Sequence, residues 1–445
     1  MKAPKPLSQP RFEALLYRRS PFTWYLFKEL EWWSTEDESL LAAITLDGID
    51  DDYAYIVLGR DETGVFRGVA NQVSFLTQDE ARAAMLSKLE ELSKDGAQEF
   101  PQEDNNRKKH EILVPCVPDA KLHPTFKILM ADDGYSPARG IIKELSFAFT
   151  DLDGNYRKDF QTQNFDSRLW EIYLYAAFYE QHFHIDDAHA VPDFIIENPA
   201  GKIAVEAVTV NPTSGVEPPI PRTVEEEQRL CLDYMPLKWG SPLVSKLAKK
   251  YWEQEHIKDL PLVFAIHDFH GPGSMVWSFP ALSDCLFGIR CGEDGADYPV
   301  ESYSWETKKD IPAGFFRQPG AENVAAVIAS NEATLTKFNR MGFIAGFGNL
   351  DVFIGRQGAM LDLETNQGGP FRYQTKVGEV SEGWSAGLWV FHNRNAKNPI
   401  PPTLFPHALH VTLDANGQRN YRSAKRYHII RSVTQIIRPP DSSPA

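Results

Sequence analysis

The chain has 445 residues, of which 42% are hydrophobic and 24% are charged. A chain of this length and composition can bury a large core, and we expect two or three globular domains. No apolar run approaches the roughly 18 residues that span a bilayer, and the N-terminal sequence lacks the apolar stretch of a signal peptide. We therefore expect a cytoplasmic protein without membrane contact.

The formal net charge is -15 at pH 7. This sign is wrong for a protein that coats nucleic acid over a wide surface, because phosphates would repel it. Any nucleic-acid contact must then be local or assisted by a metal ion. The four cysteines form no Cys-x-x-Cys pair, so the sequence indicates neither a zinc knuckle nor a disulfide framework.

The N-terminal region has the pattern of a small α/β unit. Residues 53–58 and 65–73 are strand-like and flank a turn with a glycine at each end, which predicts a β-hairpin. From Thr77 to about Ser93, leucines recur at helical spacing among charged residues, which predicts an amphipathic helix capped by Thr77. The polar segment 94–109 holds few apolar residues and is predicted to be a linker.

The composition changes again toward the C-terminal end. After about residue 271 the chain becomes rich in glycine, proline and aromatic residues and has short strand-like runs. We expect a mixed, β-rich region there. The predicted regions are an N-terminal α/β domain over 1–105, a connecting region over 106–150, a central core over 151–270 and a β-rich C-terminal region with a basic tail over 271–445.

The central core contains a second predicted hairpin. Two apolar runs rich in β-branched residues are separated by a turn from Asn198 to Gly201, with proline and glycine at favourable turn positions. If Asn198 pairs with Gly201, counting back along both strands places Asp193 opposite Glu206. Directly opposed side chains share one face of a sheet, with Cβ atoms about 4.5 to 5.5 Å apart.

Asp193 and Glu206 are therefore candidate ligands for one divalent cation. Without a cation the two carboxylates would repel each other, and one would be driven toward protonation. Glu206 also lies in an otherwise apolar run, so a buried carboxylate at this position needs a partner. The alternative is a chance pairing of two acids at an exposed sheet edge, since one bulge would change the register.

A third acid lies in a predicted helix from Ser167 to about Gln181, for which Asp166 is the expected N-cap. Glu171 stands among apolar residues in this helix. It either pairs with Arg168, three residues earlier, or points toward the metal site and orients a water there.

This order of elements resembles the αβββαβ core of the PD-(D/E)XK nucleases, which has the restriction-endonuclease-like fold. The pattern is a helix with an inward Glu, a strand, a Pro-Asp strand, a strand that carries Glu, and then a helix and a strand within residues 165–269. The resemblance implies an α/β protein with this core between α/β and β-rich regions. It also implies that Asp193, Glu206 and Glu171 bind Mg²⁺ or Mn²⁺ and act in catalysis.

The sequence departs from the family pattern at Val208, two residues after Glu206, where the family has a lysine. In some members this lysine lies on the following helix. The pair Ser241-Pro242 predicts the start of such a helix. Lys246 lies beside its apolar stripe and is the candidate catalytic lysine, with Lys250 as the second choice. The alternative is a surface helix with solvated lysines.

The resemblance implies a magnesium-dependent endonuclease that hydrolyses phosphodiester bonds in DNA, in restriction, defence or DNA processing. The metal ion would also let an acidic protein approach a polyanion. Val208 leaves a second function open: a catalytically inactive nuclease-fold module that binds nucleic acid or has a regulatory role.

The segment 419–438 is a further candidate contact with nucleic acid. It holds arginines and a lysine but no acid, with tyrosines and a histidine interleaved. Such a segment can bind phosphates and stack on bases, and we expect Arg422, Lys425 and Arg426 to contact DNA. The alternative is a basic strand that balances the acidic body of the protein.

Overall fold

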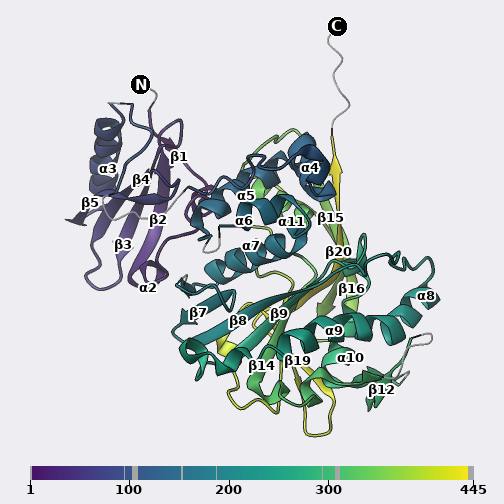
Figure 1. Cartoon of the computed structure of the whole chain (residues 1–445). Coiled ribbons are helices and arrows are strands. Elements are labelled where there is room, and N and C mark those ends of the chain that lie inside the picture. The colour runs from purple at the N-terminus through teal and green to yellow at the C-terminus, as the bar shows by residue number, and fades with distance from the viewer. Residues whose placement is uncertain are drawn as a thin grey trace.

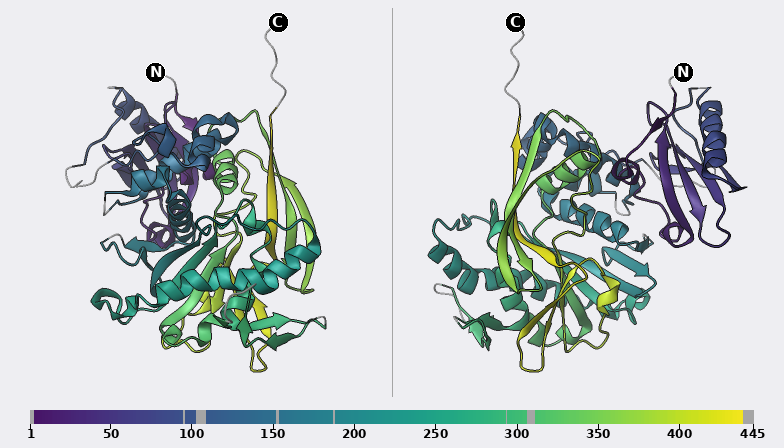
Figure 2. Two further views of the ribbon diagram at one scale, coloured as in Figure 1. Left: turned by 45° about the vertical axis from the view of Figure 1, so that its right-hand side comes forward. Right: turned by 180° about the vertical axis from the view of Figure 1, so that it is seen from behind.

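The computed structural model describes residues 3–94, 96–102, 109–151, 154–186, 188–292, 294–305 and 311–438. The expected mixed α/β class is confirmed, with a five-stranded, an eight-stranded and a three-stranded sheet as the main elements. Figure 1 shows the N-terminal sheet beside the main body of the molecule. The views in Figure 2 show the same arrangement from two other sides.

The N-terminal sheet is antiparallel, with its strands in chain order. The strands are β1 (Lys5–Pro6), β2 (Phe27–Ser34), β3 (Leu40–Asp47), β4 (Tyr53–Arg60) and β5 (Phe66–Phe75). Helix α3 (Gln78–Ser93) covers one face, and Thr77 and Glu80 form a capping box at its start. The predicted hairpin and the predicted capped helix are therefore confirmed.

The predicted linker 94–109 lies partly outside the described residues. Its described part 96–102 follows the N-terminal sheet, because the amide of Phe100 donates to the carbonyl of Arg60 at 2.8 Å. The ring of Phe100 lies so close to Gly59 that a side chain there would collide with it. This part of the segment therefore packs with the N-terminal sheet.

The central sheet has eight strands, in the spatial order β19 (Arg419–Arg422), β18 (Leu409–Leu413), β17 (Leu388–His392), β14 (Val324–Ser330), β9 (Leu262–Asp268), β8 (Gly201–Val210), β7 (Phe194–Asn198) and β6 (His184–Asp186). Strands β6, β7 and β8 form an antiparallel meander, and β9 lies parallel to β8. Strand β14 continues parallel to β9, so the sheet contains strands from both sides of residue 270.

Helices cover both faces of this sheet (Figure 1). One layer holds α5 (Ser136–Ala148), α7 (Phe165–Glu180) and α11 (Leu335–Ile344), and the opposite layer holds α9 (Met235–Leu247) and α10 (Pro280–Phe287). Along β8, Ile203 and Val205 join the core that contains α7, whereas Ala204 and Val208 join the core that contains α9. The sheet is thus the middle of three layers, and β8 is buried on both faces.

Shorter elements complete the fold. They are α1 (Gln9–Glu13), α2 (Thr23–Leu26), α4 (Pro124–Ala131), α6 (Tyr156–Gln161), and the strand pairs β10 (Ile289–Cys291) with β11 (Asp297–Pro299) and β12 (Ser302–Tyr303) with β13 (Ile311–Pro312). Among the described residues, no helix has both the length and the apolar character to cross a membrane. The four cysteines are free thiols.

Helix α7 begins at Phe165 instead of Ser167, and the predicted N-cap is wrong. The capping position is held by Asn164, and Asp166 lies in the first turn. Phe165 is fully buried and packs against the ring of Phe160 at 5.0 Å between ring centroids. Burial of this ring in the core therefore extends the helix beyond the start that capping preference indicates.

Helix α9 also begins earlier than predicted, and Ser241 is not its N-cap. Helix α8 (Val224–Arg229) continues through a π-helical turn (Leu230–Tyr234) into α9, so Pro242 lies inside a helix. An internal proline costs about 3 kcal/mol, but burying one large apolar side chain returns about 1.5 to 3 kcal/mol. Four buried side chains at i, i+4 spacing secure this helix: Met235, Trp239, Leu243 and Leu247.

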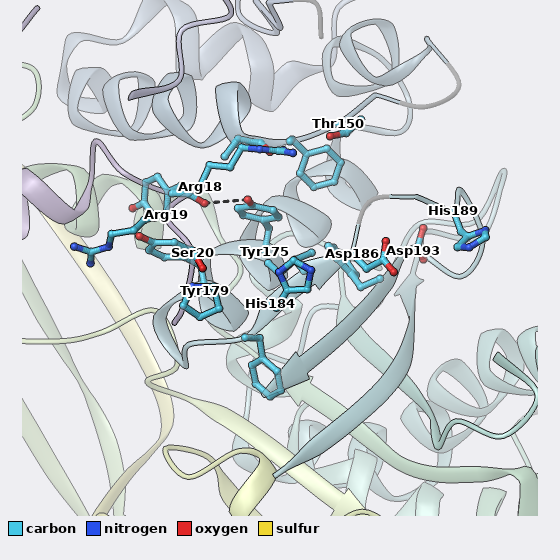
Figure 3. A pocket seen from close by; sticks show the side chains of 17 residues that line it. Arg18, Arg19, Ser20, Thr150, Tyr175, Tyr179, His184, Asp186, His189 and Asp193 are labelled. Atoms are coloured by element: carbon cyan, nitrogen blue, oxygen red, sulfur yellow. Dashed lines mark hydrogen bonds between the residues drawn. The ribbon is translucent and has the colours of Figure 1, made fainter. Parts of the chain in front are cut away.

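The segment before α2 lies against α7, as Figure 3 shows. The hydroxyl of Tyr175 on α7 donates to the carbonyl of Tyr17 at 2.9 Å. The guanidinium of Arg18 donates to the carbonyl of Ala148, at the end of α5, at 2.9 Å. These two bonds attach the N-terminal region to one helical layer, next to β6 and the start of β7.

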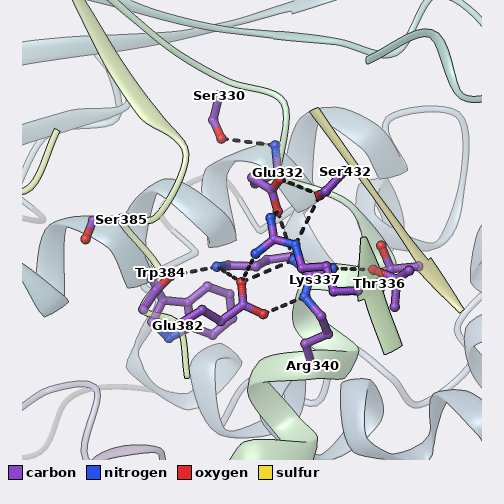
Figure 4. Close-up of polar contacts among 12 residues, drawn as sticks. Ser330, Glu332, Thr336, Lys337, Arg340, Glu382, Trp384, Ser385 and Ser432 are labelled. Atoms are coloured by element: carbon purple, nitrogen blue, oxygen red, sulfur yellow. Dashed lines mark hydrogen bonds and ion pairs between the residues drawn. The ribbon is translucent and has the colours of Figure 1, made fainter. Parts of the chain in front are cut away.

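The three-stranded sheet has the antiparallel order β16 (Gln367–Gln374), β15 (Phe353–Asp362) and β20 (Tyr427–Ile437). A buried ion network connects β15 to α11 and to two loops, and Figure 4 shows most of its members. The members of this ion network are Glu332, Lys337, Arg340, Arg356 and Glu382.

Glu382 is the centre of the ion network. Its carboxylate contacts Lys337 at 3.0 Å, Arg340 at 2.5 Å and Arg356 at 2.6 Å. Burial raises the pKa of Glu382, but the three cations more than offset burial and hold this pKa well below its ordinary value. Since the folded-state pKa is below the unfolded one, the stabilisation is present above pH 4.5 and is lost as the pH falls further.

We expect Glu382→Gln to lower the free energy of unfolding by about 3 to 5 kcal/mol, because it leaves three buried cations with too few anions. Urea denaturation followed by circular dichroism measures this loss. The matched control is Glu379→Gln, since Glu379 makes an exposed pair with Lys376 at 3.2 Å. We expect the control to change stability by no more than about 0.5 kcal/mol. Equal losses in the two variants would contradict the structural role of the network.

Candidate functional site

The predicted register of the β7–β8 hairpin is confirmed. Phe194 pairs with Val205, and Asn198 pairs with Gly201 across the turn. Asp193 stands just before the first of these pairs, and its Oδ2 accepts a hydrogen bond of 2.7 Å from the amide of Ala207 on β8. The hairpin therefore holds the carboxylate of Asp193 beside the strand that carries Glu206.

Glu206 is 5% exposed, in the middle of a strand that is otherwise apolar. Its Oε1 accepts a hydrogen bond of 2.6 Å from the hydroxyl of Tyr251. The ammonium group of Lys246, which projects from α9, forms an ion pair with the same oxygen. The structure thus brings Lys246, the candidate catalytic lysine, to Glu206. The role of Lys246 in catalysis stays a prediction.

Glu171 approaches from the opposite helical layer, on α7. Its Oε2 accepts a bond of 2.8 Å from Arg168, so the local pair that the sequence allowed is present. Arg168 also contacts Asp159 at 2.9 Å. Burial raises the pKa of Glu171 to about 7; Arg168 opposes this rise, and the charge of Glu206 adds to it. The pKa of Glu171 therefore depends on Glu206 of the hairpin as well as on burial and on Arg168.

The pKa of Asp193 is raised as well. Burial raises this pKa well above the ordinary value, and the charges of Glu206 and then Glu171 raise it further. The amide of Ala207 and the ammonium of Lys246 act in the other direction but do not offset it. The three carboxylates are thus close enough to repel, and a proton or a cation is needed to relieve the repulsion near neutral pH.

Two of the three acids border a cavity of about 400 Å³, which we call the carboxylate cavity. Asp193 and Glu171 line it together with Lys246, and the exposed Lys249 stands at the same cavity. Its other lining residues are Ser167, Trp170, Ala207, Val208, Thr209, Asn211, Pro242 and Ser245. Buried acids with perturbed pKa values in a cavity are typical of functional sites.

Asp193 and Glu206 are the two carboxylates that could hold Mg²⁺ or Mn²⁺. Among the described residues no group of three or more His, Cys, Asp or Glu side chains is placed to hold a metal ion, so an all-protein cage is not formed there. Mg²⁺ is commonly held by one or two carboxylates, with waters and substrate phosphates completing its shell. Asp193 Oδ1 and Glu206 Oε2 accept no hydrogen bond within the described chain, whereas Glu171 is engaged by Arg168.

The predicted nucleic-acid contacts in the tail lie far from these acids. Arg422 is at the end of β19, five strands from β8 in the central sheet, which corresponds to about 24 Å across the strands. Arg426 is engaged by Asp362 and Glu364, both at 2.7 Å. Arg422 and Lys425 are exposed. The structure does not bring the tail to the carboxylate cavity.

The sequence did not indicate two residues of the site. Tyr251 belongs to the apolar pattern after α9, and its hydrogen bond to Glu206 depends on packing between elements that are distant in the chain. Lys249 follows α9 and is exposed, but it also lines the cavity. Lys250, the second choice for the catalytic lysine, instead pairs with Glu253 at 3.1 Å and has a left-handed backbone conformation.

No protein-family model matches the chain, and neither a curated protein nor a solved structure shows significant similarity to it. The inferences about function therefore rest on the geometry and the chemistry of the site.

We expect the contribution of Glu171 to the stability of the metal-free protein to fall as the pH rises from 4.5 to about 7, because burial raises its pKa. In this window the unfolded chain has released the proton that the folded state still holds, so deprotonation favours unfolding. Glu171→Gln should reduce this fall by an amount of the order of 3 kcal/mol or less. Thermal unfolding in EDTA at pH 5 and pH 8 measures it.

The matched control for this experiment is Glu197→Gln, an exposed glutamate on the same hairpin as Asp193. The control should keep the pH dependence of the wild type. If Glu171→Gln keeps it too, the raised pKa of Glu171 is wrong.

Proposed function

We propose that this protein is a metal-dependent nuclease with a PD-(D/E)XK-type core that hydrolyses phosphodiester bonds in DNA. The order α7, β6, β7, β8, α9, β9 supports the proposal, because it repeats the αβββαβ order of that family. The antiparallel meander β6-β7-β8 and the parallel neighbour β9 also fit such a core.

The observation that carries the proposal is that Asp193 and Lys246 line one cavity and that Lys246 is paired with Glu206. The carboxylate of Asp193, just before β7, accepts a hydrogen bond from Ala207, the residue that follows Glu206 on β8. This combination suits phosphoryl chemistry, since the carboxylates can hold a divalent cation and the ammonium can stabilise negative charge on phosphate. Lys246 thereby stands in for the motif lysine that Val208 replaces.

Each side chain has a definable task in this reaction. Asp193 and Glu206 would hold Mg²⁺ or Mn²⁺, which supplies Lewis-acid polarisation of the phosphate and acidifies a nearby water. Lys246 would orient the attacking water and offset charge that develops on the phosphate oxygens. Tyr251 holds the carboxylate of Glu206 through its hydroxyl. Glu171, with a pKa of about 7, can accept a proton from water near neutral pH.

A second candidate is a nuclease-fold module that binds nucleic acid without cutting it. The contact between Lys246 and Glu206 favours this candidate, because an ion pair at Glu206 competes with a metal ion for the same carboxylate. Val208 in place of the motif lysine points the same way. Metal binding and DNA cleavage, measured separately, distinguish the two candidates.

We expect the wild-type protein to bind Mn²⁺ and Asp193→Asn to weaken this binding by at least about 10-fold. Removing a residue that only hydrogen-bonds to a metal ligand typically lowers metal affinity by about 10-fold to 100-fold, and removing a ligand itself should lower it at least as much. Isothermal titration calorimetry at pH 7.5 measures the affinity, with Glu197→Gln as the control on the same hairpin. Equal affinity in wild type and Asp193→Asn would place the ion elsewhere.

We expect the protein to cleave DNA in Mg²⁺ or Mn²⁺, and Asp193→Asn or Glu206→Gln to abolish cleavage. Lys246→Met should slow it by about 10² to 10⁴-fold, the usual contribution of a positioned proton-transfer group. Plasmid, single-stranded DNA and RNA are incubated in parallel and analysed on gels, with Glu197→Gln as the active control. Binding of these substrates without cleavage by the wild type would support the inactive module instead.

A further inference from the structure

One face of the three-stranded sheet borders an open cavity of about 970 Å³, which we call the sheet cavity. Cross-strand pairing defines this face. Gln357 on β15 lies between Arg372 on β16 and Val433 on β20. Two residues farther along β15, the next row on the same face consists of Pro370, Ala359 and Arg431. All the residues of these two rows line the sheet cavity.

The opposite face of the sheet is attached to the body of the protein by the ion network. Arg356 on β15 pairs with Glu382 at 2.6 Å, and the hydroxyl of Ser432 on β20 donates to Glu332 at 3.0 Å. Arg356 and Ser432 alternate in sequence with the residues that face the sheet cavity, so their side chains point to the other side of the sheet. The network therefore holds the sheet by one face and leaves the other face accessible.

The sheet cavity has positive charge although the net charge of the protein is -15. Among the described residues that line it, two are arginines and none is acidic. Arg372 is exposed and has neither a hydrogen bond nor an ion pair within the described part of the chain. Arg431 has an exposed ion pair with Glu227 at 3.3 Å, and such a pair contributes little free energy. Both guanidinium groups are therefore available to an anionic partner.

The side chains of the first row are those that recognise bases in the major groove of duplex DNA. Arginine donates two hydrogen bonds to guanine there, and glutamine bonds with two atoms of adenine. Gln357 lies directly opposite Arg372, and its side-chain amide has no hydrogen-bond partner among the residues that the structure describes. Adjacent strands are about 4.8 Å apart, so two of them fit within the groove, which is about 12 Å wide. Val433, which is 43% exposed, offers an apolar contact in the same row.

One long helical segment connects the sheet cavity with the carboxylate cavity. Glu227, the partner of Arg431, lies on α8, which continues through the π-helical turn into α9 with Lys246. Figure 1 shows the two helices following each other beside the three-stranded sheet. At about 1.5 Å per residue, the segment from Glu227 to Lys246 spans about 28 Å. This length corresponds to about eight base pairs of B-DNA.

We propose that the accessible face of the three-stranded sheet binds the major groove of duplex DNA, where Arg372 and Gln357 read base edges. Arg431 exchanges Glu227 for a phosphate of the duplex. The inference rests on the proposed function, whose substrate it narrows to duplex DNA with a preferred base sequence. It also gives a distance, because the bases that the sheet reads lie about eight base pairs from the phosphate that is cleaved beside Lys246.

The test measures binding apart from cleavage. The wild type selects duplexes from a random-sequence library in EDTA, and fluorescence anisotropy with a labelled selected duplex gives the dissociation constant. Arg372→Gln should weaken binding by about 5-fold or more and should lose the base preference at one position of the site. Arg394→Gln, at an exposed arginine after β17, is the matched control and should bind like the wild type.

A second variant tests the reading of bases without a change of charge. Gln357→Ala should relax the preference at a neighbouring base pair and leave the salt dependence of binding unchanged, because it removes no phosphate contact. Thermal unfolding checks that each variant is folded. If the wild type selects no preferred sequence, if single strands compete as well as the selected duplex, or if both variants keep the wild-type preference, the proposal is refuted.

The two proposals fail in distinguishable ways. If the wild type cleaves DNA but Arg372→Gln changes neither the dissociation constant nor the base preference, the sheet does not read DNA and the nuclease proposal is unaffected. If the wild type never cleaves but Arg372→Gln and Gln357→Ala relax the preference, the nuclease proposal fails and the sheet remains the reading surface of a DNA-binding module. If both hold, cleavage should map about eight base pairs from the preferred bases.

Discussion

The burial of β8 on both faces is the constraint on which the candidate site depends. Helices α7 and α9 cover the two faces of this strand, so Glu206 is a carboxylate in an apolar, poorly hydrated layer. An ionised side chain there costs several kcal/mol unless it is paired. Lys246 and Tyr251 supply the pairing, and both belong to the segment whose apolar side chains pack on the sheet. The packing of α9 and the charge on Glu206 therefore support each other.

The chain contains two buried clusters of charge with opposite consequences. In the ion network around Glu382, three cations surround two carboxylates, and the pKa values of both acids fall below the ordinary value. At the carboxylate cavity, burial and the neighbouring carboxylates outweigh the nearby cations, so the pKa values of Glu171 and Asp193 are raised. A cluster whose acids are all paired with cations stabilises a fold, whereas a cluster whose acids raise one another's pKa is suited to take up a cation or a proton. The direction of the pKa shifts of the buried acids therefore distinguishes the structural network around Glu382 from the candidate reactive site.

The sequence predicted local features well where neighbouring residues decide them. The capping box at Thr77 and the register from Asn198 to Gly201 depend on short-range hydrogen bonds and turn geometry, and both are confirmed. The same reasoning placed helix starts at Ser167 and Ser241, and both are wrong. In each case the helix continues past a favourable capping residue because the residues before it bury apolar side chains in the core, and burial outweighs a cap worth about 1 kcal/mol.

By itself, the sequence determined the mixed α/β class, the β7–β8 hairpin and the proximity of Asp193 to Glu206, since these follow from periodicity and from one short turn. Only the tertiary structure decided that Lys246 reaches Glu206, that the charge of Glu206 raises the pKa of Glu171 and that Arg18 stands at a cavity beside Asp193. These contacts join segments far apart in the chain. Their formation depends on how whole helices pack on the sheet, and no local pattern of residues encodes that packing.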